Sequence, residues 1–172
     1  MAENKIGSMS ENMAENKTEN STGNMTDKMS EIKPYEHKVQ YYETDQMGIV
    51  HHSNYIRWFE EARTYVLEEI GFGYREMEEC GVMSPVLEAN AEYKTMTHYS
   101  DRVLIDTKVV AYNGIRLQLA YTVRDKETGE VRCTGYTRHC FLTPEGRPLS
   151  LKRSYPEIHR IFEGLMEISD KL

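Results

Sequence analysis

The chain has 172 residues, 39% of them hydrophobic, and a formal net charge of -7 from 21 Lys and Arg against 28 Asp and Glu. This length fits one domain with one core and excludes a cofactor-binding domain beside a separate substrate domain. The acidic balance, with no run of basic residues, makes nucleic acid a poor partner.

The expected compartment follows from two absences in the sequence. No apolar stretch approaches the roughly 20 residues that cross a bilayer, and the N-terminus lacks the basic-then-apolar order of a signal peptide. Cys80, Cys133 and Cys140 are odd in number and too widely spaced for a thiolate pair, which argues against a disulfide framework or a thiolate metal site. We therefore expect a cytoplasmic protein with reduced thiols and no membrane insertion.

The N-terminal segment differs in composition from the remainder. Residues 1–33 are rich in Asn, Glu, Ser, Thr, Lys and Met and carry no aromatic side chain. Such a segment cannot bury enough apolar surface to offset the entropy lost on ordering. We predict a disordered low-complexity tail over residues 1–33 and one folded domain over residues 34–172.

The folded part opens with a predicted strand and a long helix. Alternation over His37–Tyr42 indicates a strand that ends at the turn-like residues 43–48. Ser53 or Asn54 can cap the helix that follows, and Gly71 suits its end. The apolar residues of this helix recur at steps of three and four, and we assign them to the core rather than to a cofactor pocket: Tyr55, Trp58, Phe59, Ala62, Val66 and Ile70.

The second half reads as strands between two helices. A short helical piece around Tyr74–Cys80 comes first, and a closing helix follows Pro156. The four predicted strands between them are Ser84–Lys94, Arg102–Tyr112, Arg116–Arg124 and Val131–Leu142. Turn signals at residues 113–114 and 128–129 make the last three an antiparallel meander. The alternation in Arg116–Arg124 places one set of side chains on the core face: Leu117, Leu119, Tyr121 and Val123. A sheet of this kind can bury its apolar face by curling around the one long helix.

The segment YYETDQMGIVHHSNY over residues 41–55, continued by WFEEAR, resembles the signature of hotdog-fold acyl-CoA thioesterases. It is similar to the 4-hydroxybenzoyl-CoA thioesterase branch, which includes the Tol-Pal-associated enzymes. An acidic residue, a Gly three later, a His seven later and an Asn-Tyr pair opening a helix all coincide. The resemblance implies an α+β hotdog fold, with a curved antiparallel sheet wrapped around a long central helix. It also implies thioester hydrolysis without a metal or a redox cofactor.

The resemblance assigns the catalytic carboxylate to Asp45, and it assigns the donor that polarises the thioester carbonyl to the backbone N–H of His52. The chemistry agrees, because orphan N–H groups and the dipole at a helix N-terminus stabilise the developing oxyanion. Asp45 either attacks the carbonyl or activates water as a general base, and the sequence does not choose between these roles. Gly48 allows a tight bend or the close approach of a ligand. Glu60 is a second candidate, because a helix carboxylate does the chemistry in another branch of the fold.

Coenzyme A brings phosphate charges to an acidic protein, so local cations must compensate for them. The candidates are Arg116, Arg138, Arg147, Lys152 and Arg153, of which Arg116 is best placed by analogy. The adjacent His51 and His52 do not indicate a metal site, because no spaced set of further ligands accompanies them.

The resemblance also implies partners. Two hotdog units join into one continuous sheet with the sites at their interface, so we expect a homodimer and, as a dimer of dimers, a homotetramer. Acyl-CoA is the expected substrate, and an acyl group on acyl carrier protein is an alternative. A non-catalytic module that binds acyl-CoA or a protein is a further alternative, since a fold alone does not fix function.

Overall fold

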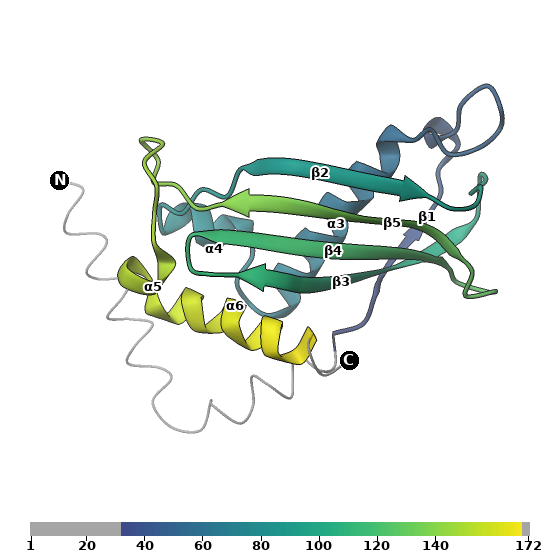
Figure 1. The fold of residues 1–172 in the computed structure, drawn as a ribbon. Helices are drawn as coiled ribbons and strands as arrows, with labels where there is room; N and C mark the ends of the chain where they lie inside the picture. The colour runs from purple at the N-terminus through teal and green to yellow at the C-terminus, as the bar shows by residue number, and fades with distance from the viewer. Residues whose placement is uncertain (1–31, 170–172) are drawn as a thin grey trace.

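The computed structural model describes residues 32–169, so the predicted tail lies outside the described residues except for Ile32 and Lys33. The described part forms one sheet with a long helix across it (Figure 1). The elements in chain order are β1 Tyr35–Lys38, the 3-10 helix η1 Tyr41–Glu43, α3 Ser53–Glu69, α4 Tyr74–Glu79, β2 Val86–Tyr93, β3 Arg102–Tyr112, β4 Arg116–Asp125, β5 Val131–Cys140, α5 Leu151–Ser154 and α6 Pro156–Ser169.

The sheet has the order β1-β3-β4-β5-β2, and every neighbouring pair is antiparallel. The strands β3, β4 and β5 form the predicted meander. Strands β1 and β2, separated in sequence by α3, lie at the two edges. Helix α3 lies behind the sheet in Figure 1, and α6 packs along β3. This is the hotdog fold expected from the resemblance.

The core lies between α3 and the concave face of the sheet. Trp58, Phe59 and Ala62 are completely buried on α3. The predicted core face of β4 is confirmed, since all four of its side chains point inward. The ring of Phe59 stacks on that of Tyr121 with centroids 4.4 Å apart. Each such aromatic contributes about 1.5–3 kcal/mol by burial, so this contact fixes where the helix lies on the sheet.

Gly135 of β5 lets α3 come this close. A Cβ on Gly135 would lie 2.6 Å from Cε2 of Phe59, and it would also overlap the carbonyl oxygen of Asn90 on β2. No residue with a side chain fits at this position, so both the packing of α3 on the sheet and the pairing of β2 with β5 depend on this glycine.

The predicted boundaries hold to within two residues for the last four strands, but the first elements differ. The first strand is β1, Tyr35–Lys38, and not His37–Tyr42, because the chain turns into η1 where the Gln40 N–H donates to the Glu43 carboxylate at 2.7 Å. Neither predicted residue caps α3 with its side chain, and His52 takes the N-cap position. Gly71 ends the helix as predicted, with a φ of 78°. The short helix α5 was not predicted. None of the helices in the described residues combines the length and apolarity needed to cross a membrane.

Candidate active site

Asp45 lies in a tight hairpin turn just before α3. Its N–H donates to the Ile49 carbonyl at 2.9 Å, and its carbonyl accepts the N–H of Gly48 at 2.9 Å. Gly48 has a φ of 74°, the left-handed conformation that closes such a loop. Oδ1 of Asp45 accepts the Met47 N–H at 2.8 Å, and Oδ2 accepts no hydrogen bond from the described residues. The turn therefore presents a half-buried carboxylate with one oxygen available for chemistry.

Glu43, two residues before Asp45, fixes this turn to the body of the protein. Its side chain is 5% exposed and accepts three hydrogen bonds, from Nε1 of Trp58 at 2.7 Å, the N–H of Gln40 at 2.7 Å and Nε2 of His37 at 2.9 Å. Burial acts to raise the pKa of this carboxyl, but the three donors outweigh burial and hold the pKa below its ordinary value. Glu43 is therefore an ionised anchor at neutral pH.

The backbone of Glu43 also holds the start of α3. Its carbonyl accepts the N–H of His51 at 2.8 Å and Nδ2 of the buried Asn54 at 2.7 Å. The Tyr93 hydroxyl of β2 donates to the carbonyl of His52 at 3.0 Å. The N–H of His52 donates to no group within the described residues 32–169. The helix thus begins with a free donor and the positive end of its dipole, held next to the segment that carries Asp45.

The side chains of two further predicted residues take no part in this turn. Glu60 is exposed on α3, about two turns along from the helix start, and lines a shallow depression with Arg57 and Tyr65 on the solvent side. The ring of His52 is exposed and lies 4.1 Å from the ring of His51. Within one protomer, the structure therefore brings together Asp45, Gly48 and the backbone of His52, but not Glu60.

The five predicted CoA cations lie at the other end of the sheet, where Arg153 follows Lys152 in α5. Arg116 opens β4 opposite Cys140, where β5 ends, whereas the residues next to the Asp45 turn precede β3. Arg138 pairs with Glu88 at 2.7 Å, and Arg147 is exposed in the loop after β5. Lys152 belongs to α5, which packs against the turn before β4. A ten-residue strand is about 33 Å long, so one protomer does not bring these cations to Asp45. We call the end of the sheet that carries Arg116 and Arg138, with Lys152 of α5 beside it, the basic end.

Sequence reasoning missed Glu43 and considered Asn54 only as a helix cap, although these two residues tie the turn to the helix. The Asn54 side chain bonds across 11 positions and the Trp58 side chain across 15, and no local period reports such contacts. The only available signal was that both residues fall inside the segment that carries the family resemblance.

Comparison with known proteins identifies the family to which the chain belongs. Residues 39–163 match the model of the thioesterase-like superfamily. YneP of Bacillus subtilis, provisionally named an acyl-CoA thioesterase, is 36% identical over 129 residues, which are 74% of this chain and 93% of the relative. The acyl-CoA thioester hydrolase YbgC of Escherichia coli O6:H1 is 27% identical over 52% of this chain and 67% of its own. The crystal structure of a DHNA-CoA thioesterase from Staphylococcus aureus is 32% identical and superposes with a TM-score of 0.75, covering 81% of this chain and 93% of that one. The chain therefore belongs to the thioesterase-like superfamily.

Proposed function

We propose that this protein is an acyl-CoA thioesterase that hydrolyses the thioester of an acyl-CoA to a free carboxylic acid and CoA. The observation that carries the proposal is the Asp45 turn, in which a carboxylate with a free oxygen is tied through Glu43 to the N-terminus of α3. The names of the relatives support the substrate class. The finer likeness to the Tol-Pal-associated enzymes stays a prediction.

The chemistry needs a nucleophile and a donor for the oxyanion. The free N–H of His52 donates to the carbonyl oxygen as negative charge develops there, and one such donor is worth about a hundredfold or more in rate. In one route the Asp45 carboxylate attacks the acyl carbon and displaces the thiolate of CoA, and water then cleaves the mixed anhydride that has formed. In the other route Asp45 takes a proton from the water that attacks the carbonyl. Both routes consume one water and yield the same acid and thiol.

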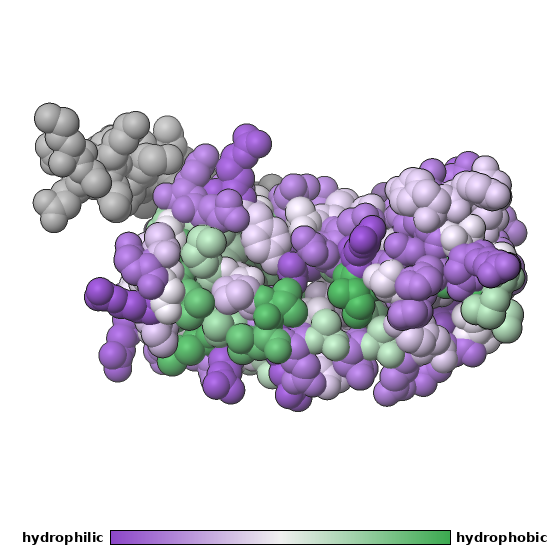
Figure 2. Space-filling view, turned by 90° about the horizontal axis from the view of Figure 1, so that it is seen from above, coloured by the Kyte–Doolittle hydropathy of each residue, from purple (hydrophilic) through white to green (hydrophobic). Residues whose placement is uncertain are grey.

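We propose a homodimer built on the outer edge of β2. This strand of eight residues pairs only with β5 in the described part of the chain, so every second residue directs its backbone N–H and C=O to the open edge. Figure 2 looks down on this side of the molecule and shows apolar residues gathered there. Val86 is 50% exposed, Leu87 55% and Tyr93 49%. A long apolar edge in a stable protein is normally covered, and a second copy covers it by continuing the sheet.

Such a dimer would also bring the cations to the substrate. When two copies of β2 pair antiparallel about a two-fold axis, the Val86 end of one strand lies beside the Tyr93 end of the other. The Tyr93 end contacts the start of α3, and the other end of β2 leads to the basic end of the sheet. The basic end of each protomer then faces the Asp45 turn of its partner, where the CoA phosphates need positive charge. The family resemblance extends this assembly to a homotetramer.

A charge on the β2 edge tests the dimer. We expect Leu87→Lys to shift the protein to monomers in light scattering and to abolish turnover, because the new ammonium would be buried in the interface. The matched control is Val110→Lys, at a residue that is 48% exposed on β3 and away from this edge. A fully active Leu87→Lys dimer would contradict the proposed interface.

The proposal places the protein in the cytoplasm. Cys80, Cys133 and Cys140 are all free thiols. Burial raises the pKa of the Cys133 thiol to about 12, so this residue is an unreactive core group. Free cysteines are typical of a reducing compartment. Cell fractionation with an antibody against the chain tests this point.

The activity is tested by following free-thiol release from short-chain, long-chain and aromatic acyl-CoA esters. DHNA-CoA joins the panel because the Staphylococcus aureus relative is named for it. We expect Asp45→Asn to lower kcat by about a hundredfold or more, as the loss of a general base or nucleophile does, while Glu60→Gln keeps its activity. Equal rates for wild type and a folded Asp45→Asn would remove Asp45 from the chemistry. A failure to hydrolyse any CoA ester would favour acyl carrier protein substrates or a binding role.

A further inference from the structure

A buried arginine without a counter-ion lies in the second half of α3. Arg63 is 6% exposed, and none of the ion pairs among the described residues involves it. Its Nη1 donates to Nε2 of His139 at 2.9 Å, and its guanidinium lies 5.2 Å from the centre of the Tyr74 ring. Burying an unpaired guanidinium is costly, so an unmet charge of this kind is a candidate for binding something outside the chain.

His139 does not neutralise that charge. Its ring is buried on β5, and burial together with the neighbouring Arg63 lowers its pKa to about 4. The imidazole is therefore neutral at pH 7 and serves Arg63 as a hydrogen-bond acceptor only. The positive charge of Arg63 is therefore not compensated by His139.

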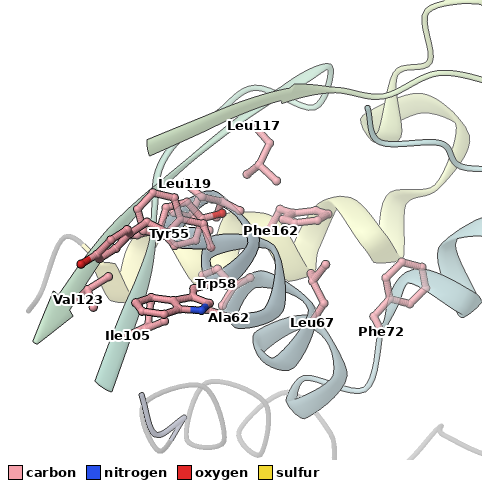
Figure 3. Close-up of a cluster of buried hydrophobic side chains, with 14 of the residues drawn as sticks. Tyr55, Trp58, Ala62, Leu67, Phe72, Ile105, Leu117, Leu119, Val123 and Phe162 are labelled. Carbon is pink, nitrogen blue, oxygen red and sulfur yellow. The ribbon is translucent and has the colours of Figure 1, made fainter. Parts of the chain in front are cut away.

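Arg63 lines a partly open cavity of about 130 Å³ between α3, α6, β3 and β4, with residues 32–34 at its side. Its walls are mostly apolar, and three of the contributing side chains come from three different elements: Leu67 of α3, Leu117 of β4 and Phe162 of α6 (Figure 3). An apolar cavity of about 150 Å³ holds a benzene molecule, so this one has room for a body of about that size.

Two of the residues that line the cavity each carry a buried donor without a partner in the described part of the chain. Nε of Arg63 and the hydroxyl of Thr107 on β3 are both buried and make no hydrogen bond within the described residues. Both residues line the same cavity. Asp106 lines it as well, but its carboxylate already pairs with Arg124 at 2.7 Å. Two free donors of this kind match the two oxygens of one carboxylate.

We propose that this cavity binds a small monocarboxylate with an apolar body of about six carbons, its carboxylate on Arg63 and Thr107. The apolar walls exclude a strongly hydrated phosphate, which would leave most of its oxygens without donors. Lys33, in the segment before β1, also lines the cavity and adds positive charge there. The site is distinct from the Asp45 turn, because Arg63 lies ten residues beyond the start of α3, which is about 15 Å along the helix.

Free carboxylic acids are also what a thioester hydrolase releases, so the ligand class is one that the proposed function would supply. The binding test does not depend on that function. Wild-type full-length protein is titrated with benzoate and with hexanoate, by calorimetry and by the shift in melting temperature. Benzyl alcohol is the uncharged probe, and chloride and inorganic phosphate are the anion probes at equal ionic strength.

We expect saturable binding of the carboxylates to the wild type and much weaker binding of the other probes. Arg63→Met should raise the dissociation constant by about tenfold or more, because it removes a charge-assisted hydrogen bond. Arg57→Met, at an exposed arginine of the same helix, should leave it unchanged. Asp45→Asn should also leave it unchanged, because the Asp45 turn lies elsewhere.

Several results would overturn the proposal: no saturable carboxylate binding to the wild type, equal binding of benzyl alcohol, binding of chloride alone, or loss of binding in Asp45→Asn. Near-UV circular dichroism reports whether Arg63→Met folds. If it does not, Thr107→Val decides, since it removes one donor and keeps the shape. Unchanged benzoate affinity in a folded Thr107→Val would then count against the site.

Discussion

Glu43→Gln is the sharpest test of how the active-site turn is held. The substitution keeps the size of the side chain and removes its charge. Oε1 accepts Nε1 of Trp58, while Oε2 accepts both the Gln40 N–H and Nε2 of His37. A glutamine offers only one oxygen, so its amide N–H must face a donor on one side. An unmet buried donor costs about 1–3 kcal/mol, and the two remaining bonds weaken from charge-assisted to neutral, so we expect a loss of about 3 kcal/mol.

The pH dependence gives an independent check of this reasoning. The donors lower the pKa of Glu43 below its ordinary value of 4.5, so its contribution to stability is present above pH 4.5. That contribution is lost as the pH falls through the lowered pKa. The difference in the free energy of unfolding between wild type and Glu43→Gln should therefore be largest at neutral pH and shrink below pH 4.5.

The assay is urea unfolding at fixed protein concentration, followed by far-UV circular dichroism and by the fluorescence of Trp58, the only tryptophan. Glu61→Gln is the matched control. Glu61 lies 3.3 Å from Nδ1 of the same His37, but its side chain is 45% exposed, so we expect a change of less than about 1 kcal/mol. If Glu43→Gln were as stable as Glu61→Gln at pH 7, the anchor role of Glu43 would be refuted.

Two glycine substitutions probe the turn and the close approach of the helix. Gly48→Ala puts a side chain at a φ of 74°, so it should lower the free energy of unfolding by about 1–2 kcal/mol and slow thiol release. Gly48→Asn should lower the free energy of unfolding less, measured by the same urea unfolding. Gly135→Ala drives a Cβ into Phe59 and the carbonyl of Asn90, so a loss of about 3 kcal/mol or more is expected by urea unfolding. Gly129→Ala, whose Cβ would meet nothing within 4 Å, is its control and should show only the backbone cost of its φ of 73°. Equal stability of the Gly135 and Gly129 variants would contradict the steric argument.

The elements that the sequence predicts well are those whose burial is periodic. The alternation in β4 and the three- and four-residue steps in α3 each reflect one buried face. The structure buries the predicted face of β4 and the first four predicted residues of α3, whereas Val66 and Ile70 are partly buried. The first strand was predicted wrongly because Tyr41 counts as the apolar residue that follows Val39 in an alternating pattern, yet Tyr41 is 77% exposed and its neighbour Tyr42 is 79% exposed. A pattern of residue types cannot distinguish an aromatic that packs inside its own protomer from one that does not.

The candidate site was predicted only in part, for a related reason. Asp45 and Gly48 follow from local turn chemistry and the family resemblance, because both act within five residues of chain. The anchors Glu43 and Asn54 act through contacts that exist only after the helix has packed. The cations near CoA pose the opposite problem, since the sequence lists them without saying that they lie at the far end of the sheet.

Two buried polar residues of α3 interrupt its apolar face, and they differ in how the protein satisfies them. Asn54 is satisfied within the chain by the carbonyl of Glu43, and that bond places the helix start beside the Asp45 turn. Arg63, nine residues later, lies against the neutral ring of His139, the face of Tyr74 and the hydroxyl of Tyr121, none of which is an anion, and its Nε remains without a partner among the described residues. A buried polar residue that stabilises the fold has its partners in the fold. Asn54 meets that condition and Arg63 does not. We therefore interpret the buried guanidinium of Arg63 as a ligand-binding group rather than as a group that stabilises the fold.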